Sequence, residues 1–210
     1  KTLIMSGVED AVCKICLEPD DLLPAHVCSC RGSLRVHLEC LINHANHQWP
    51  DLYPWSHCLT CTLPFVGQAQ MGLALALWSR LENMAVDRQE RLYAAELVSD
   101  ALRERGRYEE AAALGRQALD VRRRVLGAEH PDTLESARAL AETLRAQGQY
   151  EDAAALQRQT WDVHRRLWGA EHLGTLCCAN NLAVTLQKQG QYEEAAALQR
   201  QTLDVCRRML

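Results

Sequence analysis

Eight residues near the N-terminus have side chains that bind soft metal ions, and they are spaced in pairs. Seven of the ten cysteines of the 210-residue chain lie between residues 13 and 61. Together with one histidine they form four pairs, and only one or two residues separate the members of each pair. Zinc takes four thiolate or imidazole ligands in tetrahedral geometry, so eight ligands suffice for two ions. The sequence therefore predicts two zinc ions, bound by Cys13, Cys16, Cys28, Cys30, His37, Cys40, Cys58 and Cys61.

Composition argues against disulfides and against a membrane span. The segment before the first pair lacks the long apolar stretch of a signal peptide, and disulfides are rare in proteins that are not exported. The longest apolar run, residues 71–78, is far shorter than the roughly 20 residues that span a bilayer. A net charge of −4 gives no general attraction to nucleic acid or to anionic membranes. We therefore expect a soluble, cytoplasmic metal-binding protein with no membrane span and no nucleic-acid partner.

The middle of the cysteine-rich segment carries a specific motif. Residues 28–41 contain Cys-x-Cys-x-Gly-Ser-Leu followed by His-x-x-Cys-Leu. This motif resembles the RING-CH zinc finger of the membrane-associated RING-CH ubiquitin ligases. The resemblance implies a small zinc-stapled α+β module at residues 8–66 with a cross-braced arrangement of ligands. In that arrangement one zinc is bound by Cys13, Cys16, His37 and Cys40, and the other by Cys28, Cys30, Cys58 and Cys61.

PHD fingers, which bind histone tails, share the same order of cysteines and histidine. They usually place two or more residues between the third and fourth ligands, and a tryptophan two residues before the seventh. Here one residue separates Cys28 from Cys30, and Trp55 lies three residues before Cys58. The spacing therefore favours the RING-CH resemblance over the PHD alternative.

The RING-CH resemblance implies a ubiquitin ligase that acts without a catalytic nucleophile, because it orients a ubiquitin-charged E2 enzyme for reaction. By family position, Ile15 and Pro64 form the rims of an apolar groove for the E2, and Trp49 or Trp55 lines its floor. The chain also departs from the family, since Thr62 stands where many RING ligases carry a basic residue. This departure supports an alternative, in which the protein is a non-catalytic interaction scaffold.

The remainder of the chain repeats itself with a fixed period. Tyr108, Tyr150 and Tyr192 are 42 residues apart, and each begins a similar segment two residues after a glycine. A period of this size is typical of a solenoid of helix pairs, each of which buries its apolar face against the next. We expect a connecting helix at residues 67–84, then repeats at 85–126, 127–168 and 169–210, with the array continuing further in the full-length protein.

The QGQYEEA segment and the LGAEHPDT turn resemble the tetratricopeptide repeats of kinesin light chains. The resemblance covers about residues 85–210 and implies an all-α solenoid that binds a protein or peptide substrate. Asn180 and Asn181 match an asparagine pair of that family, and an amide side chain can hydrogen-bond both ways to a peptide backbone. The combined hypothesis is a zinc-dependent E3 ubiquitin ligase that selects its substrate through the repeats.

Other residues of the repeats are expected to be structural. The arginine runs at the ends of second helices are predicted to complement helix dipoles. Tryptophans in the repeats are predicted to fill gaps between helices, and the three cysteines outside the metal-binding segment to be small buried residues. These residues are Arg122–Arg124, Arg165–Arg166, Arg207–Arg208, Trp161, Trp168, Cys177, Cys178 and Cys206.

Overall fold

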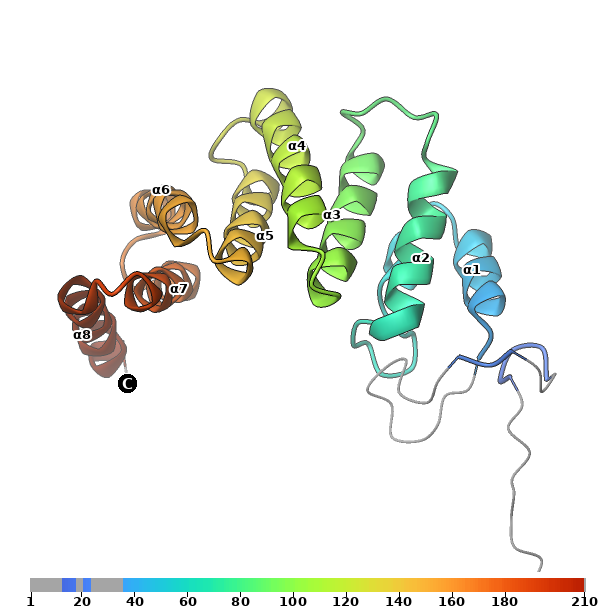
Figure 1. Ribbon diagram of the computed structural model, residues 1–210, viewed down its shortest axis with the longest axis horizontal. Coiled ribbons are helices and arrows are strands. Elements are labelled where there is room, and N and C mark those ends of the chain that lie inside the picture. Colours follow the sequence, from blue (N-terminus) through green and yellow to red (C-terminus); the bar gives the residue numbers. More distant parts are fainter. Residues whose placement is uncertain (1–12, 18–20, 24–35, 210) are drawn as a thin grey trace, which may run out of the picture. The chain divides into compact units, whose positions relative to one another are not determined.

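The computed structural model describes residues 13–17, 21–23 and 36–209, and these residues are predominantly helical (Figure 1). The chain divides into two compact units, Lys1–Ala101 and Leu102–Leu210. None of the helices in the described ranges is long and apolar enough to cross a membrane.

The first unit contains two α-helices, one turn of 3₁₀-helix and most of a third α-helix. These are α1 (Leu38–His47), η1 (Tyr53–Trp55), α2 (Gly67–Arg80) and α3 (Gln89–Glu104), the last of which ends in the second unit.

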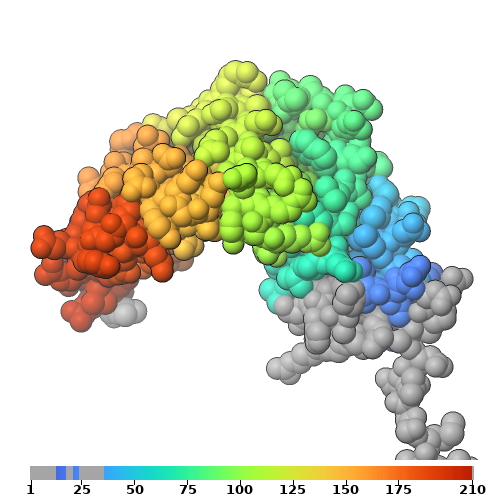
Figure 2. Space-filling view, viewed as in Figure 1, coloured from blue at the N-terminus to red at the C-terminus, as the bar shows by residue number. Residues whose placement is uncertain are grey.

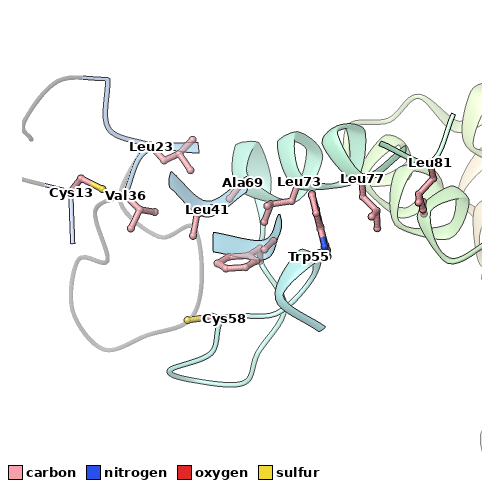
Figure 3. Packing of buried hydrophobic residues seen from close by; sticks show 13 residues of the cluster. Cys13, Leu23, Val36, Leu41, Trp55, Cys58, Ala69, Leu73, Leu77 and Leu81 are labelled. Atoms are coloured by element: carbon pink, nitrogen blue, oxygen red, sulfur yellow. The ribbon is translucent and has the colours of Figure 1, made fainter. Parts of the chain in front are cut away.

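One hydrophobic core runs through the first unit (Figure 3). It contains Cys13 and Cys58 from the metal-binding segment, Trp55 from η1, and Leu73 and Leu77 from α2. Ala94 of α3 belongs to the same cluster. The segment that follows the last cysteine is therefore not a linker, since α2 supplies much of the apolar surface on which the cysteine-rich residues pack.

The sequence predicted strands in the cysteine-rich module, and the described residues contain none. They contain one isolated β-bridge, between His57 and Pro64. Inside this bridge the backbone N–H of Cys58 donates to the carbonyl of Leu63 at 3.0 Å, and that of Thr62 donates to the carbonyl of Cys58 at 2.8 Å. The result is a tight loop that presents Cys58 and Cys61, and the predicted α+β class is not confirmed.

The second unit is a row of helices in which each packs on the next. In the space-filling view, successive colours of this part of the chain adjoin one another (Figure 2). Small alanines and leucines at 3.6-residue spacing form the packed faces, for example Ala137, Leu140 and Leu144 against Ala112 and Leu119. This is the helix-pair solenoid that the 42-residue period predicted. Its helices are α4 (Tyr108–Leu126), α5 (Pro131–Gln147), α6 (Tyr150–Trp168), α7 (Leu173–Lys188) and α8 (Tyr192–Met209).

Local sequence explains where these helices begin and end. Gly148 follows α5 with a φ of 86°, a left-handed conformation that glycine adopts without steric cost. The N–H of Gln149 then donates to the carbonyl of Leu144 at 2.9 Å and closes the helix end. At the other end, the Nδ1 atom of His130 accepts from the N–H of Asp132 at 3.2 Å, and Pro131 occupies the first helical position.

Candidate functional site

Four predicted zinc ligands converge in the first unit. The Sγ atoms of Cys13, Cys16 and Cys40 and a ring nitrogen of His37 all lie within 4.8 Å of one another. The Nδ1 atom of His37 is 3.2 Å from the Sγ atom of Cys16 and 3.6 Å from that of Cys40. These four residues are the set that the RING-CH resemblance assigned to one ion.

The spacing of these four atoms fits a tetrahedral zinc site. Zinc–sulfur bonds of about 2.3 Å and zinc–nitrogen bonds of about 2.0 Å place neighbouring ligand atoms about 3.5–3.8 Å apart. Local structure positions each pair. Cys13 and Cys16 lie in a turn, in which the N–H of Ile15 donates to the Sγ atom of Cys13 at 3.4 Å. His37 is the N-cap of α1 and Cys40 lies in its first turn.

The protonation of these thiols reflects their crowding. Burial raises the pKa of Cys13, but hydrogen bonds from the backbone near Cys16, His37 and Ile15 outweigh it and lower that pKa to about 6. Burial, together with the neighbouring Cys16 and Cys13, raises the pKa of Cys40 to about 12. A divalent cation would relieve this repulsion between thiolates, because it supplies the opposite charge at their centre.

Of the second predicted set, the structure describes only one pair. Cys58 is buried and Cys61 is half-buried, at the two ends of the tight loop described above. Cys28 and Cys30 lie outside the described residues, so the second zinc ion stays a prediction.

The residues predicted to contact an E2 enzyme are placed differently from one another. Ile15 is 48 % exposed on the turn between the first two ligands, and Pro64 is exposed beyond Cys61. Trp55 is only 1 % exposed, because its ring packs in the core against the apolar side chains of α2. The prediction that Trp55 lines the floor of a docking groove is therefore wrong. Thr62, which replaces a basic residue, accepts a hydrogen bond at its carbonyl from the Tyr53 hydroxyl at 3.0 Å.

The predicted peptide-binding asparagines lie on α7. Asn180 is exposed, and Asn181 lines a hollow of about 220 Å³ in the second unit. Cys177 also lines this hollow and is exposed, so the prediction that it is a buried packing residue is wrong. The full lining is Pro131, Leu134, Glu135, Arg138, Thr160, His164, Trp168, Gly174, Cys177, Cys178 and Asn181.

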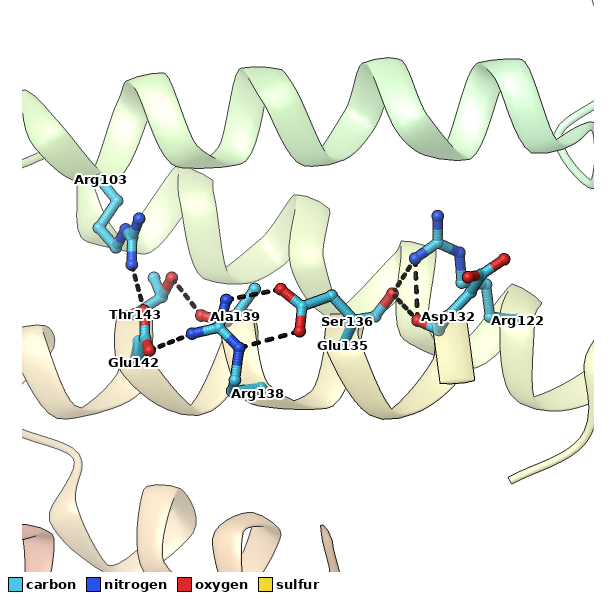
Figure 4. A network of polar contacts seen from close by, with 9 residues as sticks. All are labelled: Arg103, Arg122, Asp132, Glu135, Ser136, Arg138, Ala139, Glu142 and Thr143. Carbon is cyan, nitrogen blue, oxygen red and sulfur yellow. Dashed lines mark hydrogen bonds and ion pairs between the residues drawn. The ribbon is translucent and has the colours of Figure 1, made fainter. Parts of the chain in front are cut away.

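A network of charged side chains lies on α5 (Figure 4). The guanidinium of Arg138 donates to Glu135 at 2.5 and 2.9 Å and also to Glu142, which accepts from Arg103 at 2.8 Å. The hydrogen bond from Arg138 holds the pKa of Glu135 below its ordinary value, and the carboxylates raise the pKa of Arg138. The two guanidinium groups of the network are therefore matched by two carboxylates.

Comparison with known proteins identifies the repeated part of the chain. Two family models, both described as tetratricopeptide repeat, match residues 90–166 and 175–210. These segments are tetratricopeptide repeats. No curated protein matched the chain.

Solved structures show the same fold. The tetratricopeptide-like repeats of a Podosopora anserina protein described as a kinesin light chain are 21 % identical, with a TM-score of 0.61, 82 % of this chain covered and 86 % of that one. A single-residue variant of that protein is 22 % identical, with a TM-score of 0.60, 80 % of this chain covered and 84 % of that one. BtubC, also named BKLC, from P. vanneervenii is 15 % identical, with a TM-score of 0.56, 82 % of this chain covered and 62 % of that one. At these identities the likeness shows a shared fold.

The tetratricopeptide repeats contain residues whose positions the sequence analysis did not anticipate. Arg122 was predicted to complement a helix dipole, but it is buried between α4 and α5. Trp168 was predicted to fill a gap, but it is 39 % exposed, tilted against His164 and stacked on His172. A comparison of successive repeats in the sequence could have indicated that this position differs, because His164 occupies the position that Arg122 has one repeat earlier.

Proposed function

We propose that this protein is a zinc-dependent E3 ubiquitin ligase of RING type. Its cysteine-rich unit binds a ubiquitin-charged E2 enzyme, and its tetratricopeptide repeats bind the protein substrate. The observation that carries the proposal is the convergence of Cys13, Cys16, His37 and Cys40, in the pairing that the RING-CH resemblance implies. Reactions of this class need no nucleophile from the ligase, because orientation of the thioester toward the acceptor amine provides the acceleration.

Zinc would have a structural role in this protein. Bound zinc supplies folding free energy and fixes the loops that surround it. Cys13, Cys16, His37 and Cys40 would hold one ion. Cys58 and Cys61 would hold the second, together with Cys28 and Cys30.

The surface of the cysteine-rich unit supports binding of a partner. Several apolar side chains of its ligand-bearing loops are exposed, although the backbone that carries them is tied down by hydrogen bonds. Exposed apolar side chains on a rigid surface favour protein docking, because their burial needs little additional ordering. These side chains are Ile15, Leu59, Leu63 and Val66, each between 41 and 52 % exposed.

Tetratricopeptide repeats are protein-interaction units, and one feature of α7 supports a role in substrate binding. The side chain of Asn181 lines the hollow. An amide offers both a donor and an acceptor, which matches the backbone of an extended peptide. The preceding equivalent, Ala139, has no such group.

A second candidate function is a zinc-finger scaffold without ligase activity. It is favoured by Thr62, a neutral residue whose carbonyl is held by Tyr53 at the place where many RING ligases carry a cation. The burial of Trp55 also removes one expected contact with the E2.

An autoubiquitination assay with a panel of E2 enzymes distinguishes the two. It compares the intact chain, a Cys13→Ser/Cys16→Ser variant, Ile15→Ala and Leu203→Ala, with bound zinc measured for each protein. Leu203 on α8 is the matched control, since its exposure of 48 % equals that of Ile15. The ligase proposal expects ubiquitin chains that require the two cysteines and Ile15 but not Leu203. Zinc binding with no ubiquitin transfer by any E2 supports the scaffold instead.

A further inference from the structure

Two successive repeats fill the same position in different ways. Between α4 and α5, the residue Arg122 is only 7 % exposed. Its Nη1 atom donates to the backbone carbonyl of Asp132 at 2.9 Å and to the Oγ atom of Ser136 at 2.6 Å (Figure 4). One period of 42 residues later, the equivalents of these three residues are His164, Gly174 and Cys178.

All three equivalents line the 220 Å³ hollow. An imidazole is shorter than a guanidino side chain, and the Nδ1 atom of His164 is 2.9 Å from the carbonyl of Thr160, in the preceding turn of its own helix. The glycine at 174 fits this arrangement, because a Cβ atom there would lie only 3.2 Å from Cδ2 of His164. The space that Arg122 fills in the earlier pair of helices is therefore open between α6 and α7.

The lining of the hollow offers hydrogen-bond acceptors to a guanidinium, whereas the charges of Glu135 and Arg138 offset one another. A carbonyl can only accept, so Nδ1 of His164 carries the proton that it donates to Thr160, and in the uncharged form of the ring Nε2 is an acceptor. Glu135 is a carboxylate at neutral pH, because its hydrogen bond from Arg138 lowers its pKa. Burial raises the pKa of Cys178 to about 11, so this thiol is uncharged.

Two further residues of the lining affect the choice of ligand. Trp168 is 39 % exposed, with its indole against the rings of His164 and His172, and an electron-rich indole attracts a guanidinium close to it. Among the described residues that line the hollow, Arg138 alone is a lysine or arginine, and its guanidinium is bonded to the carboxylates of Glu135 and Glu142. Its charge is thus matched, and the acceptors and the aromatic ring determine what the hollow favours.

We propose that this hollow binds the guanidinium of an arginine side chain from the peptide segment that the repeats recognise. The incoming arginine takes the position that Arg122 takes within the preceding repeat, with Trp168 beside its guanidinium and Asn181 beside the peptide backbone. This inference rests on the proposed role of the repeats in substrate binding, and it names one residue type that the substrate must present.

The test uses three capped pentapeptides, Ala-Ala-Xaa-Ala-Ala, in which the central residue is arginine, citrulline or leucine. Citrulline keeps the shape of arginine without its charge. Each peptide is titrated into the full chain while the indole resonance of Trp168 and the side-chain amide of Asn181 are followed by NMR. We expect the arginine peptide to bind at least tenfold more tightly than the other two.

Variants of the chain complete the test. His164→Arg/Cys178→Ser copies the arrangement of the preceding repeat and places an arginine of the chain itself in the hollow. It should lower affinity for the arginine peptide at least tenfold and leave the melting temperature within a few degrees. Cys206→Arg, at the equivalent position of α8, is the control and should leave affinity unchanged. Asn181→Ala tests the backbone contact, and should weaken binding of all three peptides.

Three results would overturn the assignment of arginine. The citrulline peptide could bind as tightly as the arginine peptide, the leucine peptide could bind more tightly, or the double variant could bind normally. If these peptides still bind in a manner that depends on Asn181, substrate recognition by the repeats stands and only the arginine preference fails. If no peptide shifts either resonance, both the arginine site and the peptide-binding role of Asn181 are wrong, whereas ubiquitin transfer by the first unit is tested separately.

Discussion

The Nδ1 atom of His37 lies 3.2 Å from the Sγ atom of Cys16, although 21 residues separate them in the chain. Neither residue reaches the other through regular secondary structure, since Cys16 lies in a turn and His37 caps α1. A metal ion bound by both residues would cross-link the two segments and restrict the unfolded chain.

Replacing Cys13 and Cys16 together by serine should lower bound zinc by one ion per chain. Structural zinc contributes on the order of 10 kcal/mol to the folding of small modules, so the first unit should also lose its cooperative unfolding transition. Zinc analysis and thermal unfolding followed by near-ultraviolet circular dichroism measure the two effects. Cys177→Ser, which changes an exposed cysteine outside the cluster, is the control and should alter neither. An unchanged zinc content in the double variant would refute the site.

Arg122→Ala should destabilise the second unit by about 2–3 kcal/mol, because it leaves a void and removes hydrogen bonds to Asp132 and Ser136. Arg123→Ala, one residue later on the exposed side of α4, should cost less than about 0.5 kcal/mol. Urea unfolding of the two variants provides the comparison. Equal effects would show that the burial of Arg122 is energetically unimportant.

The Arg138 network should contribute to stability in a pH-dependent manner. The pKa of Glu135 is lowered from 4.5 by Arg138, so the contribution is complete above pH 4.5 and is lost as the pH falls through the lowered value. Arg138→Met should cost about 1 kcal/mol at pH 7, a small value because the side chains are partly exposed. Urea unfolding should show that the difference in free energy of unfolding between Arg138→Met and the wild type becomes smaller in acid. Arg124→Met, on the exposed side of α4, should show no such narrowing.

Gly148→Ala should destabilise the second unit by about 1 kcal/mol, since alanine at a φ of 86° brings its Cβ atom too close to the backbone. Gly148→Asn should cost less, because asparagine tolerates the left-handed conformation better. Apart from the adjoining backbone, no atom lies within 4 Å of a Cβ atom built at this position, so the effect reports backbone strain rather than a clash with another side chain. Identical melting temperatures for the two variants would exclude backbone strain as the cause.

Features with a strong periodic or pairwise signal could be predicted from the sequence. The 42-residue period predicted the helix pairs, because each repeat buries the same small apolar residues. The pairing of Cys13 with His37 required more than spacing, and it came from resemblance to a known motif. The strands expected in the cysteine-rich module depended on that resemblance alone, and the described residues do not contain them.

Burial of individual polar and aromatic residues could not be predicted in the same way. Arg122 belongs to a run of three arginines, and only the packing of α5 on α4 determines which of the three is buried. Trp55 lies close in sequence to the exposed residues Tyr53 and Leu59, yet it is buried because α2 supplies its partners. The hollow beside Trp168 arises because the later repeat lacks the arginine that fills this space in the earlier one. The difference is visible only when one repeat is compared with the previous one.

The core shared by Trp55, Phe65 and the leucines of α2 limits how this zinc-binding segment could pass between proteins during evolution. A gene fragment that ended at residue 66 would encode an aromatic pair without its partners, and the remaining fragment would expose Leu73, Leu77 and Leu81 to water. Both products would be prone to aggregate. Exon exchange or a designed fusion should therefore carry α2 and the first half of α3 along with the cysteines.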